Sequence, residues 1–149
     1  MKKPLKKAVL LDSHPYPFTI MVSVGQTAKE VNQSFEKLAG LKVTDEAAKK
    51  DFILDGAAAR VVPVGVRGIE KKDHKSVAFI LMFDEEYLVY PGKLAHESFH
   101  LVDQAFNTIG IELEPGGMNE HWAYLIDSYA DQIAKEFILN VRRKKISKR

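Results

Sequence analysis

The run SVAFILMF, residues 76–83, constrains the fold of this chain more than any other stretch. Seven of its eight residues are apolar, so an extended chain would present apolar side chains on both of its faces. A strand of this kind is normally buried on both faces. We therefore expect residues 76–83 to form a central strand of a sheet.

Two further strands and a helix are predicted before this run. KKAVLLD and PFTIMVSVG, residues 6–12 and 17–25, have the composition of strands and flank the loop SHPYP. Thr27 and Glu30 then form a capping box, which begins a helix, and Gly40 ends it. Apolar residues at helical spacing follow the cap, so this helix should bury one face.

The segments that follow this helix are less regular. Residues 44–54 predict a second, shorter helix that is capped by Thr44. Residues 56–68 contain Pro63 and Gly65, which favour an edge strand or an irregular loop.

Two long helices are predicted in the second half of the chain. YLVY, residues 87–90, indicates a strand that returns as a hairpin, and an amphipathic helix follows over residues 93–109. A final helix over residues 118–140 carries a broad apolar stripe of Trp122, Leu125, Ile126, Tyr129, Ile133, Phe137 and Ile138. The expected fold class is α+β, with a small antiparallel or mixed sheet packed beside the two long helices.

The composition is that of a folded domain without cysteine. Apolar residues make up 46% and charged residues 28% of the chain, and the lack of cysteine excludes a disulfide framework and a thiolate zinc site. We expect residues 1–141 to form a single domain. Residues 142–149 carry six basic side chains and form a basic tail, which is either a solvated end or a contact for nucleic acid. No stretch has the length of a signal peptide's apolar region or of a membrane span, so we expect a cytoplasmic protein without a membrane partner.

The helix over residues 93–109 contains the pattern HESFH. At about 100° per residue, His96 and His100 stand one turn apart on the polar face, where two imidazoles can bind one metal ion. Glu97 is rotated away from them, and it can accept a proton from a water at that metal. Because every amphipathic helix has a polar face, the pattern alone also fits solvated side chains.

A zinc site of this kind needs a third protein ligand. The longer metzincin pattern would place a histidine six residues after His100, but that position is Phe106. Glu120, preceded by Asn119, lies near the start of the final helix, and an antiparallel helix pair would bring it across the polar face of the first. We therefore expect His96, His100 and Glu120 to hold Zn²⁺.

HESFH followed by NEHWA resembles the gluzincin, or thermolysin-like, metallopeptidases, and the resemblance covers roughly residues 77–135. In that family the zinc ligands are the two histidines and a glutamate on the next helix. The short chain and the continuation AYLID are most similar to the compact metallopeptidases of phage and prophage genomes. The resemblance implies a zincin-like fold and hydrolysis of a peptide or protein substrate through a zinc-activated water, with Glu97 as the general base.

The chain departs from the family pattern in two places. Thermolysin-like enzymes have an aspartate four residues after the ligand glutamate, where this chain has Tyr124, so Asp127 or Asp103 is left to orient a ligand histidine. The family also has a downstream histidine that stabilises the transition state, and no histidine follows His121 here. The candidates for that role are Tyr124, Tyr87, Tyr90 and His74. A non-catalytic zinc-binding protein on the same scaffold, acting through partner contacts, is therefore the alternative function.

The three remaining histidines are expected at the surface or in loops, and the one tryptophan is expected in the core. His121 should lie at the surface or at the rim of the site, and His14 and His74 should lie in loops. Trp122 should anchor the core of the final helix.

Overall fold

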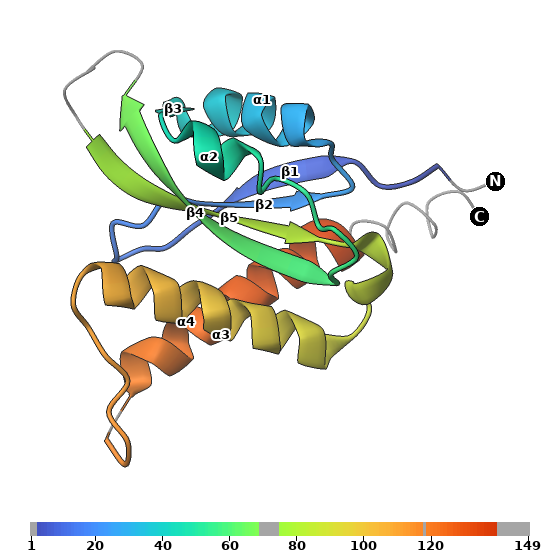
Figure 1. Ribbon diagram of the computed structural model, residues 1–149. Helices are drawn as coiled ribbons and strands as arrows, with labels where there is room; N and C mark the ends of the chain where they lie inside the picture. The colour runs from blue at the N-terminus through green and yellow to red at the C-terminus, as the bar shows by residue number, and fades with distance from the viewer. Residues whose placement is uncertain (1–2, 69–74, 118, 140–149) are drawn as a thin grey trace. The chain divides into compact units, whose positions relative to one another are not determined.

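Strand β5, Lys75–Phe83, lies at the centre of a mixed sheet, as its apolar sequence predicts. The computed structural model describes residues 3–68, 75–117 and 119–139. Within these residues the sheet has five strands in the order β1-β2-β5-β4-β3 (Figure 1). Strand β2 runs parallel to β5, and the other neighbouring strands pair antiparallel. The remaining strands are β1 Lys7–Leu11, β2 Ile20–Val24, β3 Leu41–Val43 and β4 Ala59–Gly68.

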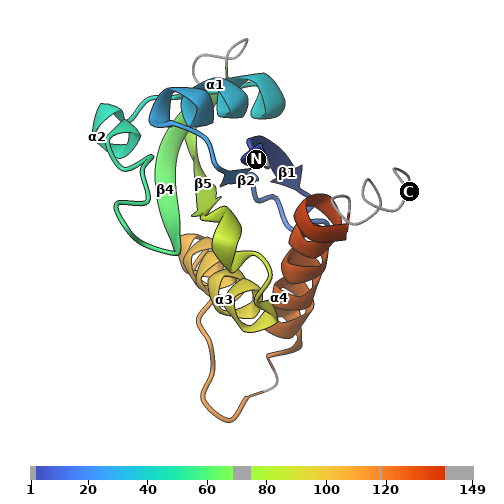
Figure 2. The same ribbon diagram turned by 90° about the vertical axis from the view of Figure 1, so that its right-hand side faces the viewer.

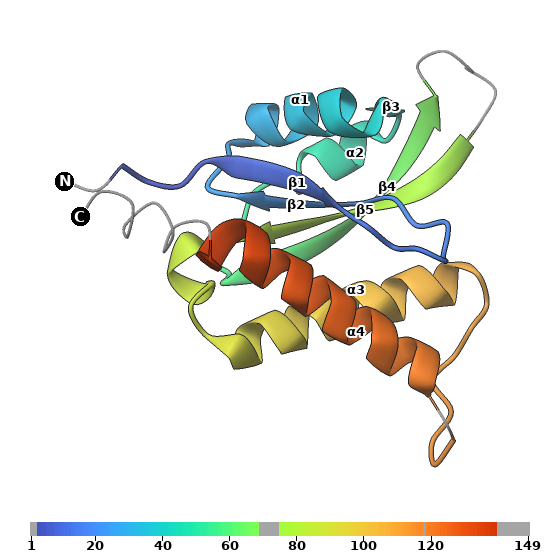
Figure 3. The same ribbon diagram turned by 180° about the vertical axis from the view of Figure 1, so that it is seen from behind.

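Helices α1, Ala28–Ala39, and α2, Glu46–Lys49, cover one face of this sheet (Figures 1 and 3). Val31 and Phe35 of α1 are buried against apolar side chains that alternate along the strands. The strand residues of this cluster are Met21, Val43, Val62, Val64, Val66, Ala78, Ile80 and Met82. The apolar residues at helical spacing on α1 and those that alternate along the strands therefore pack together in one core.

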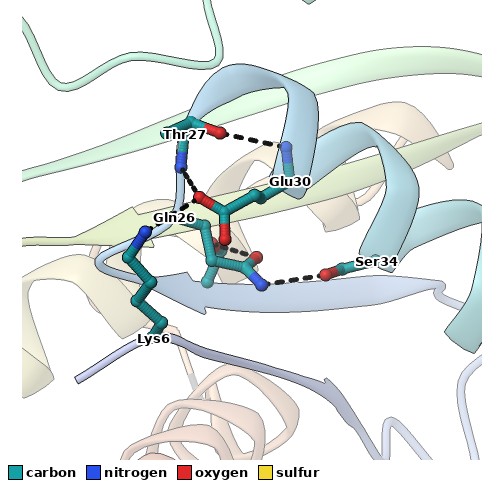
Figure 4. Close-up of polar contacts among 6 residues, drawn as sticks. Lys6, Gln26, Thr27, Glu30 and Ser34 are labelled. Carbon is teal, nitrogen blue, oxygen red and sulfur yellow. Dashed lines mark hydrogen bonds and ion pairs between the residues drawn. The ribbon is translucent and has the colours of Figure 1, made fainter.

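The first turn of α1 has the predicted capping box (Figure 4). The Glu30 backbone N–H donates to Thr27 Oγ1 at 3.2 Å, and the Thr27 N–H donates to Glu30 Oε1, also at 3.2 Å. Lys6 Nζ lies 3.3 Å from the same carboxylate oxygen. Gly40 ends the helix in the left-handed conformation, with φ of 64°, which costs a glycine little.

Helix α2 is shorter than predicted, and Thr44 does not cap it. Asp45 Oδ1 accepts hydrogen bonds from the backbone N–H groups of Ala47 and Ala48, at 3.0 and 3.2 Å. The Thr44 N–H donates instead to the Gly65 carbonyl at 2.9 Å, so the backbone of Thr44 continues the pairing of β3 with β4. The predicted cap is therefore wrong by one residue.

Strand β4 lies between β5 and β3, so the predicted edge strand or irregular loop is wrong for the strand as a whole. The pairing around Pro63 nevertheless explains why a proline is tolerated in this strand. β3 pairs with β4 only at Val66–Gly68, whereas Pro63 lies opposite Phe79 of β5. Among the described strands Pro63 thus has a neighbour on one side only, where a residue without an N–H is tolerated.

The chain divides into two compact units, Met1–Glu85 and Glu86–Arg149, and the second unit is helical. Its helices α3, Pro91–Thr108, and α4, Glu120–Ile133, lie side by side and cross (Figures 2 and 3). A π-helical segment, η2, continues α4 over Ala134–Leu139. The predicted apolar stripe is confirmed, since its buried members are Trp122, Leu125, Tyr129, Ile133 and Phe137. The α+β class, the mixed sheet and the two long helices are thus confirmed.

The hairpin strand predicted for YLVY is wrong. Glu85–Tyr87 form a 3₁₀ turn, η1, and Tyr90 occupies the N-cap position of α3. Pro91 takes the first position of α3, where its missing N–H costs no helical hydrogen bond. The helix start at Pro91 has overridden the strand propensity of the preceding aromatic and β-branched residues.

Within the residues that the structure describes, no helix is long and apolar enough to cross a membrane. The predicted basic tail, 142–149, lies outside the described residues, as does His74.

Candidate metal centre

Helix α3 places His96 and His100 on its exposed face. The buried residues of α3 are Leu94, Ser98, Leu101, Val102, Ala105 and Phe106. At about 100° per residue these side chains occupy one side of the helix, and the two histidines lie on the opposite side. The sequence therefore separates a core face from a histidine face on the same helix.

The two imidazole rings converge. His96 Nε2 and His100 Nε2 are 3.1 Å apart, and the rings are nearly perpendicular, at 83°. Two nitrogens bound to one tetrahedral zinc at about 2.0–2.1 Å would lie about 3.3 Å apart. The observed separation is thus close to the spacing that a shared metal requires. A neutral ring can also donate a hydrogen bond to the other across this distance, so the contact forms without a metal as well.

Glu97 lies beside this pair and is well shielded from solvent. Its side chain is 13% exposed, against 62% for His96, because it points to the border of the buried face. Glu97 Oε1 lies 3.9 Å from His96 Nε2. A carboxylate at this position can accept a proton from a water bound next to the histidines.

Glu120 does not join the histidines in a metal-binding group. Among the described residues, no three His, Cys, Asp or Glu side chains are arranged to hold a metal ion. Helix α4 turns Trp122 towards α3, where its ring lies 6.1 Å from Phe99 and 5.3 Å from Phe106. Glu120 comes two residues earlier, about 160° away around the helix, and is exposed.

Asn119 fixes the loop that leads to Glu120. Its side-chain Nδ2 donates to the carbonyls of Glu114 and Gly117, at 3.0 and 3.2 Å, and its Oδ1 accepts from the Glu114 N–H at 3.1 Å. Asn119 therefore holds the loop closed and makes no side-chain cap on α4. This contact sets the point at which Glu120 enters the helix.

Asp103 and Asp127 are the two carboxylates proposed to orient a ligand histidine. Among the described residues, neither makes a hydrogen bond or ion pair with His96 or His100. Asp103 Oδ1 accepts a hydrogen bond from Asn107 Nδ2 at 3.3 Å. Asp127 is exposed on α4, as is Tyr124, whose exposure is 55%.

His121 is more enclosed than predicted. Its ring lies against Phe106, with centroids 5.2 Å apart, and its Nε2 is buried without a hydrogen-bond partner among the described residues. The contact between α3 and α4 therefore uses His121 as packing surface. Trp122 is 1% exposed and anchors the same contact, as predicted. His14 lies in the loop after β1, also as predicted.

A recess next to His96 was not foreseen from the sequence. It has a volume of about 540 Å³ and is lined by Tyr87, Tyr90, Pro91, Gly92, Lys93 and His96. A hairpin strand is predicted for YLVY, which would place Tyr87 and Tyr90 in that strand. In the structure, these two tyrosines lie at the entry to α3. The signal available was Pro91, which is typical of a first helical position.

Comparisons with known proteins assign this geometry to no family. No protein-family model matches the chain. The searches of curated proteins and of solved structures found no match either.

Proposed function

We propose that this protein is a zinc-dependent peptidase of the gluzincin type, with its active site on the histidine face of α3. The observation that carries the proposal is the convergence of His96 Nε2 and His100 Nε2 at 3.1 Å beside the shielded carboxylate of Glu97. Two imidazoles and an adjacent carboxylate are the side chains that metal-assisted hydrolysis requires.

His96 and His100 would hold the metal, with Glu120 as the proposed third ligand. A zinc ion bound there would supply a Lewis acid for the scissile carbonyl and would lower the pKa of a nearby water. Glu97 would take the proton of the attacking water and deliver it to the leaving amine. Its partial burial favours this role, because it limits competition from bulk water for the carboxylate.

The third ligand is the part of the proposal that demands a change in the structure. Glu120 is exposed in the first turn of α4, on the side away from the Trp122 contact with α3. Zinc binding would therefore require the first turn of α4 to bring this carboxylate to the histidines.

The recess beside His96 favours two of the candidate oxyanion-stabilising residues. Tyr87 and Tyr90 line it together with His96, whereas Tyr124 is absent from its lining. A phenol O–H at this position would donate to the oxyanion that forms on the substrate carbonyl. We therefore propose Tyr87 or Tyr90 for this role.

The experiment that tests the proposal is the Glu97→Gln variant, assayed on a peptide library with zinc content measured in parallel. Removal of a general base should reduce hydrolysis by about 100- to 10,000-fold, while zinc binding is retained at the level of the parent protein. Glu112→Gln, in the exposed loop after α3, is the matched control and should cleave normally. Equal cleavage by the Glu97→Gln variant would sink the mechanism.

A second candidate is a zinc-binding protein without catalytic activity that acts through partner contacts. The observation that favours it is that no histidine follows His121, so the residue that stabilises the transition state in the family has no counterpart in this chain. It predicts that the parent protein binds zinc but cleaves no peptide of the library. The same two measurements therefore separate the two candidates.

A further inference from the structure

The recess at the start of α3 has the size and position of a substrate subsite. Its volume of about 540 Å³ lies within the range of about 300–1,000 Å³ that is typical of small-ligand sites. His96 forms one of its walls, so a group bound there would lie next to the proposed reaction centre. This inference rests on the proposed function for the identity of the bound molecule as a peptide.

The chemistry of the lining favours a negatively charged group. Lys93 is the one cation among the six lining residues, and none of the six is a carboxylate. Tyr87 and Tyr90 also line the recess, and the one that does not serve the oxyanion has a phenol group that can donate a hydrogen bond to an anion. Glu86 precedes Tyr87 in the chain but does not line the recess.

Lys93 has the freedom to bind such a group. It is exposed, and within the described part of the chain no ion pair involves it. Its observed contact is with the ring of Tyr87, where Nζ lies 5.9 Å from the centroid. A contact of this kind holds the ammonium at the recess and leaves its N–H donors available.

The two tyrosines give the recess a defined shape. Their ring centroids are 6.4 Å apart and the ring planes are inclined by 46°. The lining thus combines two aromatic rings and a phenol donor with the ammonium of Lys93. This combination suits an amino-acid residue that carries a carboxylate, since the apolar part of the residue contacts the rings while the carboxylate meets Lys93.

We propose that this recess is a specificity subsite that binds a peptide carboxylate, with Lys93 as its specificity-determining residue. The carboxylate has two possible sources, an acidic side chain or the free C-terminus of a peptide. Both present the same planar anion to Lys93, and the experiment distinguishes them.

The test measures peptide binding by nuclear magnetic resonance titration of the tyrosine ring signals, in a Glu97→Gln background that prevents cleavage. One pair of probes is an N-acetylated, C-amidated peptide with a central glutamate and the same peptide with glutamine. The other pair is N-acetyl-trialanine with a free C-terminus and its C-terminal amide. We expect one pair to show about five- to tenfold tighter binding of the carboxylate member, and that pair identifies the source.

Lys93→Gln should abolish this difference within the pair, and Lys93→Arg should retain it because the charge is kept. Lys135→Gln is the matched control, since Lys135 is an exposed lysine of η2 that pairs with Asp131 and does not line the recess. Equal binding within both pairs, no binding of any probe, or no effect of Lys93→Gln would each overturn the proposal. Displacement by inorganic phosphate at the same concentration would assign a general anion site instead and would also overturn it.

The binding assay needs neither zinc nor turnover, so its outcome is separate from that of the proposed function. Carboxylate-selective binding in a protein that cleaves no peptide would remove the peptidase and keep the subsite. Peptide cleavage without carboxylate-selective binding would keep the peptidase and remove the subsite.

Discussion

Two polar clusters, one in each unit of this molecule, are organised in opposite ways. In the sheet unit, Lys6, Thr27 and Glu30 satisfy one another around the first turn of α1, and Gln26 links Ser23 to Ser34 through hydrogen bonds of 2.9 Å. In the helical unit, His96 and His100 turn their Nε2 atoms towards each other, and Glu97 stays 3.9 Å from His96.

The difference shows which cluster serves stability. The α1 cluster pairs donors with acceptors and satisfies the N–H groups that a helix start leaves free. On α3, two imidazoles converge at about the spacing that a shared metal ion requires, and we propose that this arrangement serves binding and contributes little to folding. Variants of both clusters, and of the contact that supports α3, test this division.

Trp122→Ala should have the largest effect. Trp122 is 1% exposed and packs on Phe99 and Phe106, so its truncation should cost about 3–5 kcal/mol of the free energy of unfolding. Urea denaturation followed by far-ultraviolet circular dichroism measures this loss. Trp122→Phe is the control and should cost much less, because the ring volume is largely kept and the indole N–H has no partner among the described residues. A small loss in Trp122→Ala would show that the α3–α4 contact is not the core of the helical unit.

His100→Ala should weaken zinc binding by about 100-fold or more. Loss of a group that merely supports a metal ligand costs about 10- to 100-fold in affinity, and loss of a ligand should cost at least as much. Equilibrium competition with a chromophoric chelator measures the dissociation constant. Folding should change little, because His100 lies on the exposed face of α3.

His14→Ala is the matched control for this measurement, since His14 is an exposed histidine of the loop after β1. Zinc affinity should be unchanged in that variant. Equal affinity in the parent protein, in His14→Ala and in His100→Ala would remove the distinction between the two clusters, because the histidine face would then be an ordinary solvated surface.

The elements that were predicted correctly are those whose signals are local. The capping box at Thr27, the glycine at position 40 and the apolar run of β5 each determine backbone structure through residues a few positions apart. The His96–His100 pair belongs to the same class, since a spacing of four on one helix fixes their proximity.

The errors arose where the outcome depends on a partner in space. Pro63 predicts that its strand lies at the edge of the sheet. Because β3 pairs with only the last residues of β4, the prediction holds for the part of β4 that contains Pro63 and fails for the rest. The strand propensity of residues 87–90 gave way to the helix start at Pro91. The position of Glu120 also depends on a partner in space, because the packing of Trp122 on α3 sets the rotation of α4. Its role as a metal ligand stays a prediction.

The smallest expected effect is on the pH dependence of stability, through the carboxyl of Glu30. The pKa of the Glu30 carboxyl is lowered from its usual value of 4.5, chiefly by the hydrogen bond from the Thr27 backbone N–H and then by Lys6. A carboxyl whose pKa is lower in the folded state binds fewer protons than in the unfolded state. Its contribution to stability is therefore complete above pH 4.5 and is lost as the pH falls through the lowered value.

Glu30→Gln should remove this contribution, so stability should fall less steeply with acid than in the parent protein. Urea midpoints at neutral pH and at several pH values below 4.5 measure the slope. Glu36→Gln removes a carboxylate from the same helix whose side chain makes no hydrogen bond or ion pair in the part of the chain that the structure describes, and it should leave the slope unchanged. Because the capping cluster is exposed, the change will be smaller than either effect in the helical unit. Identical slopes in all three proteins would show that the α1 cluster does not stabilise the fold through its charge, and the contrast with the histidine face would then rest on hydrogen bonding alone.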